Sequence, residues 1–383
     1  MPSWYPDKDE PLRGIFCQKQ AQAISRYAQL TVMVIRPCDL LQKRRLVVES
    51  DESGIQVIRI YFRKSKSAGL GKYIDLAKAC VLGMNHFNVL RRSKGNFDVL
   101  HVNEINPMGL VAIVLKSIYR IPYVITLHGS EYTKEDGRYF NKSVLQRWLV
   151  KKILDRSSFV VAVSNYLQAA LATICRHANL VVIANLVECH PEQAGGRSWH
   201  GMNLLHVSLL CDRKKNVSGL IRIMAALKND PHHARLDIVG CGQDEEKLKQ
   251  LSRDLGLFGH IVFFHGLVAH DQVGDFFDRA DIFICNSKVE TFSVACAEAL
   301  MHGVPVLSTR CGGPEEYITG EVGFLVPLND PEALLAALKT MMAHLHEYDR
   351  TAIRNYAESL FAPKKIALEY MELYKKAAGG SPD

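Results

Sequence analysis

The sequence lacks the features of a small protein held together by disulfides. Its 383 residues include ten cysteines, but these are scattered and none forms a Cys-x-x-Cys pair. No secretory signal is recognisable either. We therefore expect reduced thiols in a cytoplasmic protein with two compact domains of roughly 150–200 residues each.

Long hydrophobic runs and complete cofactor motifs are absent as well. The most apolar stretch, residues 110–127, is interrupted by Lys116 and Pro122, so it falls short of the ~20 apolar residues that a membrane-spanning helix needs. The dinucleotide motif that Gly240 and Gly242 begin lacks its third glycine, which disfavours an NAD oxidoreductase. No His-Glu-x-x-His or comparable ligand set occurs, so we expect no metal and no bound cofactor.

The two halves of the chain differ in charge. Residues 1–185 contain 27 Lys and Arg against 14 Asp and Glu, a net +13, whereas residues 186–383 contain 20 against 26, a net −6. This asymmetry predicts two domains with different partners. Between residues 144 and 156, apolar side chains recur at helical spacing among the cations, which fits either a solvated helix packed on a core or a basic face resting on anionic lipid. No nucleic-acid-binding motif occurs, so we expect no nucleic acid partner.

Short apolar segments rich in β-branched residues alternate with helical patterns, which predicts βα units and parallel sheets. Because twelve strands are too many for one such sheet, we expect two sheets. The polar segment 191–198, where the charge changes sign, predicts the link between the domains, and a last helix is predicted over residues 363–376. The predicted strands are residues 31–36, 55–61, 99–103, 123–127, 159–164, 181–183, 204–209, 235–239, 261–265, 282–286, 304–309 and 323–326.

Two glutamates, Glu290 and Glu298, flank the predicted start of a helix near Ser293, just after the strand that ends at Asn286. At a rise of 1.5 Å per residue, the two carboxylates are up to ~12 Å apart along the axis, too far for an acid and a base acting on one bond. The separation suits one carboxylate at each end of a nucleoside diphosphate, whose phosphates the helix N-terminus would bind.

Turns after other predicted strands carry further candidates, because open α/β sheets bind ligands at the carboxyl ends of their strands. The turn at Gly240 and Gly242 lets the backbone approach a ligand. The cationic run Arg213-Lys214-Lys215 is placed to neutralise a phosphate, and His128 is placed to contact a sugar or a proton in transfer. A solvated loop and a structural histidine are the open alternatives.

Residues 204–326 resemble family 4 of the retaining glycosyltransferases, which have the GT-B fold of two facing Rossmann-like domains. The matching motifs, in the family's order, are Lys215-Asn216 before a helix, Ile238-Val-Gly-Cys-Gly-Gln243, Phe264-His-Gly266, Ala280-Asp-Ile-Phe283, Glu290 to Glu298, Gly303-Val-Pro-Val306, Gly312-Gly-Pro-Glu-Glu316 and Gly323-Phe-Leu-Val-Pro327. The first half matches more loosely, at Pro2-Ser-Trp-Tyr-Pro6, Gly14-Ile-Phe16, Leu127-His-Gly129, Val163-Ser164 and Asn185. Altogether the resemblance spans nearly the whole chain.

The resemblance implies an α/β fold of two Rossmann-like domains whose parallel sheets face each other across a cleft. The acceptor-binding domain would span residues 1–188 and the nucleotide-sugar-binding domain residues 199–362. A C-terminal helix within residues 363–383 would pack back on the first domain. The implied reaction moves a sugar from a nucleoside-diphosphate donor to an acceptor hydroxyl, with retention at the anomeric carbon and without a metal.

The resemblance also implies site residues and a setting. Glu290 would hold the donor sugar, Lys215 would neutralise the leaving diphosphate, and His128 would face the sugar. The implied donor-binding residues are Glu298 at the ribose, the backbone near Phe292, Ser293 and Val294 at the diphosphate, and Gly14, Gly242, Arg213, Lys214 and His265. The setting would be the assembly of a bacterial polysaccharide or glycolipid, with the basic domain on the inner face of the plasma membrane and a lipid-linked saccharide as acceptor.

Two departures from the family pattern stand out. The family commonly has an arginine where this chain has Leu209, so Arg213 or Lys214 would supply the second positive charge, or it is absent. The family also places a strand before Pro2. Pro2 and Pro6 lack backbone donors and predict no strand over residues 1–6, so we expect that the first strand is missing or that the true start lies upstream.

Two other functions stay open at this stage. One is a nucleotide-sugar-binding protein with little transfer activity, and the other is a non-hydrolysing sugar-nucleotide epimerase of the same fold. Measurable transfer would exclude the first, and sugar interconversion without an acceptor would identify the second. The sequence predicts neither the base and sugar of the donor nor the acceptor, the linkage or the oligomeric state.

Overall fold

The chain divides into two compact units, Met1–Leu186 with Pro363–Asp383, and Val187–Ala362. The computed structural model describes residues 1–7, 10, 13–39, 45–66, 70–175, 179–188 and 201–379. The predicted link at residues 191–198 lies outside these ranges. Among the described helices, none is long and apolar enough to cross a membrane.

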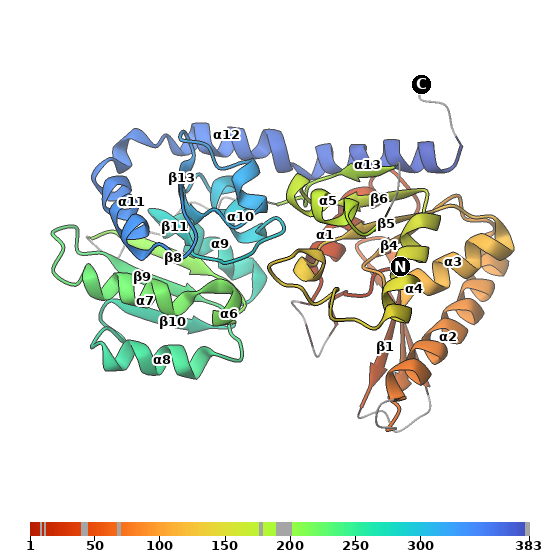
Figure 1. The fold of residues 1–383 in the computed structure, drawn as a ribbon. Helices are drawn as coiled ribbons and strands as arrows, with labels where there is room; N and C mark the ends of the chain where they lie inside the picture. The colour runs from red at the N-terminus through yellow and green to blue at the C-terminus, as the bar shows by residue number, and fades with distance from the viewer. Residues whose placement is uncertain are drawn as a thin grey trace. The chain divides into compact units, whose positions relative to one another are not determined.

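The first unit is built from parallel βα connections with helices packed on the sheets (Figure 1). Each of the six strands predicted in this half is confirmed, and one more is present. The elements are α1 (Ile15–Ser25), β1 (Thr31–Cys38), β2 (Arg45–Glu52), β3 (Ile55–Arg63), α2 (Gly71–Lys94), β4 (Leu100–Asn103), α3 (Met108–Tyr119), β5 (Tyr123–Leu127), η1 (Ser130–Tyr132), α4 (Val144–Arg156), β6 (Phe159–Ala162), α5 (Asn165–Ala172), β7 (Leu180–Val182) and α13 (Pro363–Ala377).

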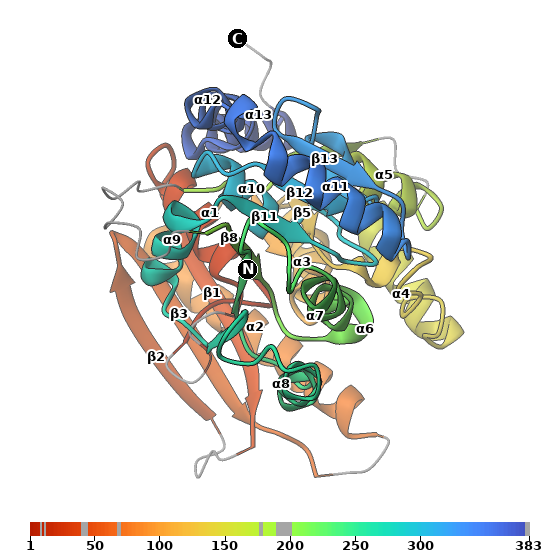
Figure 2. The same cartoon turned by 90° about the vertical axis from the view of Figure 1, so that its left-hand side faces the viewer.

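The strands of the first unit form two sheets, so the described part of the chain has three sheets rather than the two expected. One sheet has the order β1-β3-β2 and the other the order β4-β5-β6-β7. Figure 2 shows the three-stranded sheet as long red and orange arrows. The expectation was wrong because no ladder of backbone hydrogen bonds joins β1 to β4 among the described residues.

Residues 1–3 lie along β4, although Pro2 predicted that this segment would not pair with a strand. The Met1 amino group donates to the His101 carbonyl at 2.5 Å, and the Ser3 N–H donates to the Asn103 carbonyl at 2.9 Å. Successive residues of an extended chain point their N–H groups to opposite sides, so the donor that Pro2 lacks would face away from β4. The segment therefore forms an isolated parallel bridge between Pro2 and Asn103 rather than a full strand.

The sequence analysis missed strand β2, which pairs antiparallel with β3. The two-residue turn between them consists of Ser53 and Gly54, with φ of 57° and 81°, the positive values of a type I′ hairpin turn. Most of β2 is exposed at the edge of its sheet. An edge strand needs few apolar residues, so the Ser53-Gly54 pair was a stronger sequence signal for the β2–β3 hairpin than the composition of β2.

The C-terminal helix α13 packs in the first unit, against α1 and β5. The Tyr370 hydroxyl lies 3.1 Å from Thr126 Oγ1, and the Tyr374 hydroxyl lies 2.5 Å from His101 Nδ1. The helix thus covers one end of β4 and β5 with both polar and apolar contacts. Its buried side chains in the shared core cluster are Ile366, Ala367, Tyr370 and Leu373.

The second unit contains one six-stranded parallel sheet in the order β10-β9-β8-β11-β12-β13. All six strands predicted in this half are confirmed. The elements are β8 (Asn203–Val207), α6 (Asp212–Lys215), α7 (Val217–Ala226), β9 (Arg235–Val239), α8 (Glu245–Asp254), β10 (Val262–Gly266), α9 (His270–Arg279), β11 (Ile282–Cys285), α10 (Val294–Met301), β12 (Val306–Thr309), η2 (Gly313–Glu316), β13 (Gly323–Val326), α11 (Pro331–Ala343), η3 (Leu345–Glu347) and α12 (Arg350–Phe361).

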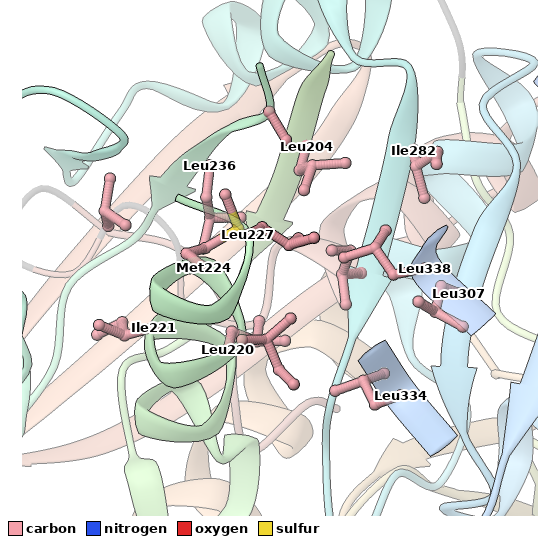
Figure 3. Close-up of a cluster of buried hydrophobic side chains, with 14 of the residues drawn as sticks. Leu204, Leu220, Ile221, Met224, Leu227, Leu236, Ile282, Leu307, Leu334 and Leu338 are labelled. Atoms are coloured by element: carbon pink, nitrogen blue, oxygen red, sulfur yellow. The ribbon is translucent and has the colours of Figure 1, made fainter. Parts of the chain in front are cut away.

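The core of the second unit lies between this sheet and helices α7 and α11. Figure 3 shows side chains of both helices gathered around Leu204, Leu236 and Leu307 of the strands. Parallel strands that are buried on both faces need continuous apolar runs, which is why these strands were readable from the sequence. The rigid sheet fixes the positions of the turns that follow its strands.

Candidate active site

The six-stranded sheet has a topological switch point between β8 and β11. From β8 the strand order continues through β9 to β10, and from β11 it continues through β12 to β13 toward the other edge. Open α/β sheets bind ligands outside the carboxyl ends of the strands at such a point. The segments that follow β8 and β11 are therefore the first candidates for a site.

Lys215 and Glu290 meet at this switch point, although 75 residues separate them. Lys215 ends α6 after β8, and Glu290 follows β11. Lys215 Nζ forms an ion pair with Glu290 Oε1, which also accepts a hydrogen bond from Ser287 Oγ at 2.6 Å. The two charged side chains are only 22% and 11% exposed. The structure thus brings together two of the three residues predicted to be catalytic.

Electrostatics keeps this lysine charged. Burial alone would lower the pKa of Lys215, but the adjacent Glu290 carboxylate outweighs burial and raises that pKa well above its ordinary value. A permanently charged ammonium group at the end of a strand can neutralise a phosphate.

Among the described residues, no group of three His, Cys, Asp or Glu is arranged to hold a metal ion.

Backbone contacts fix the segment that carries Glu290. The Glu290 N–H donates to the Cys311 carbonyl at 2.7 Å, and the Glu290 carbonyl accepts from the Gly313 N–H at 2.9 Å. A Cβ at Gly313 would lie 2.3 Å from the Thr291 carbonyl oxygen, so this close approach of two main chains requires glycine. The turn after β12 therefore positions Glu290.

Helix α10 begins four residues beyond Glu290, at Val294. Ser293 precedes it with φ of 63°, and its hydroxyl donates to Cys296 Sγ at 3.2 Å rather than capping the helix. The first-turn N–H groups thus have no side-chain cap, which leaves them suited to an anion. Glu298 lies one turn further along, on the same face as Val294, since residues four apart share a helix face.

The side chain of Phe292 packs in the core beside the site and does not line the site itself. Its ring is buried against the rings of Tyr317 and Phe361. Its carbonyl accepts a hydrogen bond from the Tyr317 hydroxyl at 2.6 Å. These contacts hold the turn between Glu290 and α10, and the predicted contact of the backbone amides near Phe292 with a diphosphate stays a prediction.

The run Arg213-Lys214-Lys215 forms the short helix α6, not the loop that the sequence suggested. Asp212 ties α6 to its neighbours, because its Oδ1 accepts from the N–H of Ser218 in the first turn of α7 and its own N–H donates to Asp244 Oδ2, both at 2.8 Å. Lys215 pairs with Glu290, while Arg213 is exposed and Lys214 is half-buried. Leu209, at the position of the family arginine, is 67% exposed.

Gly242 and His265 lie at the carboxyl ends of β9 and β10, one and two strands from β8. A Cβ at Gly242 would lie 2.4 Å from the Leu210 carbonyl oxygen, so this glycine packs against the segment that follows β8. His265 Nε2 lies 2.8 Å from Asp237 Oδ1. Both residues lie on the ligand-binding edge of the sheet, and their predicted contacts with a donor stay predictions.

In the first unit, His128 and Gly14 lie on neighbouring segments. Gly14 precedes α1 with φ of 74°, and the His128 ring lies 4.5 Å from the ring of Phe16 on that helix. His128 Nε2 is 3.0 Å from Asn103 Oδ1. Burial lowers the pKa of His128 to about 3, so its imidazole is uncharged at neutral pH, and its predicted contact with a sugar stays a prediction.

Sequence reasoning missed three polar residues of these two clusters. Ser287 bonds Glu290, and Asn286 Nδ2 donates to the Asn216 carbonyl at 3.0 Å. Glu104 Oε1 accepts from the N–H groups of His128 and Gly129. Asn286 ends a predicted strand, and Ser287 and Glu104 each follow one directly, so a position at the carboxyl end of a strand was the available signal.

Two family models match the chain in succession. The model described as Glycosyltransferase Family 4 matches residues 53–190, and the model described as Glycosyl transferases group 1 matches residues 205–359. Together they span most of the chain and confirm the resemblance that the sequence motifs indicated.

Curated relatives agree with these matches. The chain is 25% identical over 298 residues to the N-acetyl-alpha-D-glucosaminyl L-malate synthase of Bacillus anthracis, covering 73% of this chain and 74% of that protein. It is 28% identical over 292 residues to the phosphatidyl-myo-inositol mannosyltransferase of Mycobacterium leprae, covering 74% and 75%.

Solved structures share the fold. The sucrose-phosphate synthase of Thermosynechococcus elongatus superposes with a TM-score of 0.77 at 20% identity, covering 96% of this chain and 94% of that chain. The Anabaena protein Alr3699/HepE, solved in complex with UDP-glucose, superposes with a TM-score of 0.72 at 20% identity, covering 95% and 96%. The chain is therefore a glycosyltransferase of the GT-B fold and belongs to glycosyltransferase family 4.

Proposed function

We propose that this glycosyltransferase moves a hexose from a nucleoside-diphosphate donor to an acceptor hydroxyl with retention at the anomeric carbon, in the assembly of a bacterial polysaccharide or glycolipid. The observation that carries the proposal is the Lys215–Glu290 ion pair at the switch point between β8 and β11, close in sequence to the uncapped N-terminus of α10.

In this proposal the donor diphosphate binds between Lys215 and the first turn of α10. Glu290, fixed by its backbone contacts, holds hydroxyls of the sugar, and Glu298 binds the ribose. As the sugar leaves, charge grows on the diphosphate, and Lys215 together with the helix N-terminus stabilises that charge. The leaving diphosphate accepts the proton of the acceptor hydroxyl. Because these groups supply the positive charge, we expect the reaction to need no added divalent cation.

The first donors to test are uridine diphosphate sugars. The reason is the structural likeness to Alr3699/HepE, which was solved with UDP-glucose. A transfer assay that follows release of the nucleoside diphosphate, with and without EDTA, tests the donor and the metal independence together. Proton NMR of the product shows whether the anomeric configuration is retained.

Variants separate transfer from binding alone. Glu290→Ala and Lys215→Ala should each lower turnover more than tenfold, because both groups act on the reacting donor. Lys249→Ala is a matched control, since it removes an ion pair of similar type with Glu245 on the surface of α8. Equal turnover in all of these variants would contradict the roles. Donor binding without transfer would favour a sugar-nucleotide-binding protein. Sugar interconversion without an acceptor would favour an epimerase.

We propose further that the acceptor is lipid-linked and that the first unit rests peripherally on the inner face of the plasma membrane. A groove of about 350 Å³ runs between the start of α2 and α4, and its lining includes Lys72, Lys142, Tyr73 and Leu145. Exposed apolar side chains continue from it, with Leu145 64% and Trp148 53% exposed on α4. Cations interleaved with exposed apolar side chains favour anionic lipid.

Vesicle binding tests this second part without any assay of transfer. The full chain should bind vesicles of anionic phospholipid, and the double change of Leu145 and Trp148 to Ala should weaken that binding at least fivefold. Phe324→Ala, which removes an exposed aromatic ring from β13 in the second unit, is the matched control. Equal binding of all three proteins, or no binding, would contradict the peripheral location.

A further inference from the structure

Glu104 at the end of β4 has an unusual backbone conformation for its residue type. Its φ is 65°, in the left-handed region, and the residue is only 6% exposed. The surroundings enforce this conformation, because the Glu104 N–H donates to the Thr126 carbonyl and the Glu104 carbonyl accepts from Ser3 Oγ, both at 3.0 Å. Left-handed non-glycine residues persist only where neighbours over-determine them, and they gather at functional sites.

The carboxyl group of Glu104 holds the loop that follows β5. One oxygen, Oε1, accepts from the His128 N–H at 2.7 Å and from the Gly129 N–H at 2.9 Å. The preceding residue, Asn103, contacts the His128 ring through Oδ1. Asn103, which ends β4, and Glu104, which follows it, therefore fix both the main chain and the imidazole of His128. Neither has a role assigned in the function proposed above.

We propose that Glu104 is a positioning residue for sugar transfer, which sets the His128–Gly129 backbone through its two N–H···O bonds. The inference rests on the proposed function, because Glu104 would act on the reaction only through His128. It requires the left-handed turn at Glu104, since that turn directs the carboxyl group toward the neighbouring strand end.

The protonation of Glu104 adds a pH dependence to this arrangement. Burial first and the nearby Glu131 carboxylate second raise the pKa of the Glu104 carboxyl to about 7, against the opposing effect of the two amide donors and Lys142. A carboxylate accepts hydrogen bonds more strongly than a carboxylic acid does. While Glu104 stays buried, its two N–H···O bonds to the loop should therefore be stronger at pH 8 than at pH 6, although ionising the buried carboxyl lowers the overall unfolding free energy. The titratable or charged groups that face Glu104 are Cys17, His128, Glu131, Tyr132, Arg138 and Lys142.

The experiment combines hydrogen exchange with a pH profile of turnover on the full chain. In Glu104→Ala, exchange of the His128 and Gly129 amides should speed up at least tenfold, and turnover should fall more than tenfold. In Glu104→Gln, whose amide oxygen can still accept both bonds, exchange should change less than threefold. Wild-type turnover should rise several-fold between pH 6 and pH 8, and Glu104→Gln should lose that rise. Glu135→Gln, whose carboxylate bonds the Tyr166 hydroxyl, should behave as wild type.

Unchanged exchange in Glu104→Ala, or a wild-type pH profile in Glu104→Gln, would overturn the proposal. Stabilisation by nucleoside diphosphates should persist in every Glu104 variant, because Lys215, Glu298 and the first turn of α10, which are proposed to bind the diphosphate and the ribose, belong to the second unit. If the wild type shows no transfer with any donor, the proposed function fails. The exchange measurement still decides separately whether Glu104 holds the loop.

Discussion

Two glutamates at the carboxyl ends of parallel strands illustrate two ways of holding a buried carboxylate. Glu290 in the second unit faces the ammonium group of Lys215 and the hydroxyl of Ser287. Glu104 in the first unit is held by two backbone N–H groups and has a raised pKa of about 7. The first carboxylate is paired with a cation, and the second accepts its hydrogen bonds from backbone dipoles.

This difference separates the tasks of the two residues. An ion pair contains a cation that can turn toward an incoming diphosphate, so the Lys215–Glu290 pair suits ligand binding and charge neutralisation. A carboxylate held by amides cannot release its partners without moving the main chain, so Glu104 suits the fixing of a loop. The following changes break or sharpen that contrast.

The largest effect is expected from Lys215→Met, which leaves Glu290 without its cation. Removing one partner of a buried pair should cost about 3 kcal/mol of unfolding free energy, and turnover should fall more than tenfold. Urea denaturation and donor turnover measure the two effects. Adding Glu290→Gln should recover most of the stability but none of the turnover. If Lys215→Met alone is no less stable than Lys215→Met combined with Glu290→Gln, the ion pair is only a surface contact.

Glu104→Gln should change how stability depends on pH. The carboxyl pKa is about 7 in the folded chain and about 4.3 in an unfolded one. Between these pH values the unfolded chain releases a proton that the folded chain keeps, so wild-type stability falls as pH rises, by about 4 kcal/mol in all. Glu104→Gln should lack this fall. Parallel curves of unfolding free energy between pH 4.5 and 7.5 for the two proteins would contradict the buried titration.

Gly242→Ala tests whether the turn after β9 needs its close approach to the segment after β8. The added Cβ would lie 2.4 Å from the Leu210 carbonyl oxygen, whereas a Cβ at Gly320 would meet nothing within 4 Å. Gly242→Ala should therefore cost about 2 kcal/mol, and Gly320→Ala should cost much less. Thermal unfolding of the two variants gives the comparison, and equal midpoints would argue against a tight turn.

The smallest effect is expected from Glu298→Ala. If Glu298 binds only the ribose, the dissociation constant of the nucleoside diphosphate should rise about tenfold, or about 1.4 kcal/mol. Turnover at saturating donor should change less than threefold. Titration calorimetry and a donor saturation curve check both numbers. A large loss of turnover at saturation would place Glu298 in the chemistry instead.

The sequence predicted the strands of the second unit well because most of them contain continuous apolar runs, such as residues 282–285 and 304–307. It also singled out Lys215 and Glu290 as site candidates, since each follows a strand and adjacent strand ends share one edge of a sheet, but it did not predict their ion pair. The helix α6 and the exposed edge strand β2 were missed, because four polar residues and a solvated strand have no apolar periodicity.

The roles of Glu104 and Ser287 could not be predicted from local sequence. Both depend on which strands are neighbours, because Glu104 bonds a loop 24 and 25 residues away and Ser287 joins a pair that spans 75 residues. Strands β1 and β4 likewise belong to different sheets because of the strands with which each one pairs, not because of the composition of either strand.

The central claim is that Lys215 and Glu290 mark the donor site, with Lys215 at the diphosphate, and a thermal-shift panel with UDP, GDP, ADP, CMP and dTDP on wild type and Lys215→Met tests it most directly. A ligand at a hundred times its dissociation constant adds about 2.7 kcal/mol, which moves the midpoint by several degrees. The account predicts such a shift for one base in the wild type and its loss in Lys215→Met. No shift with any nucleotide, or equal shifts in both proteins, would contradict it.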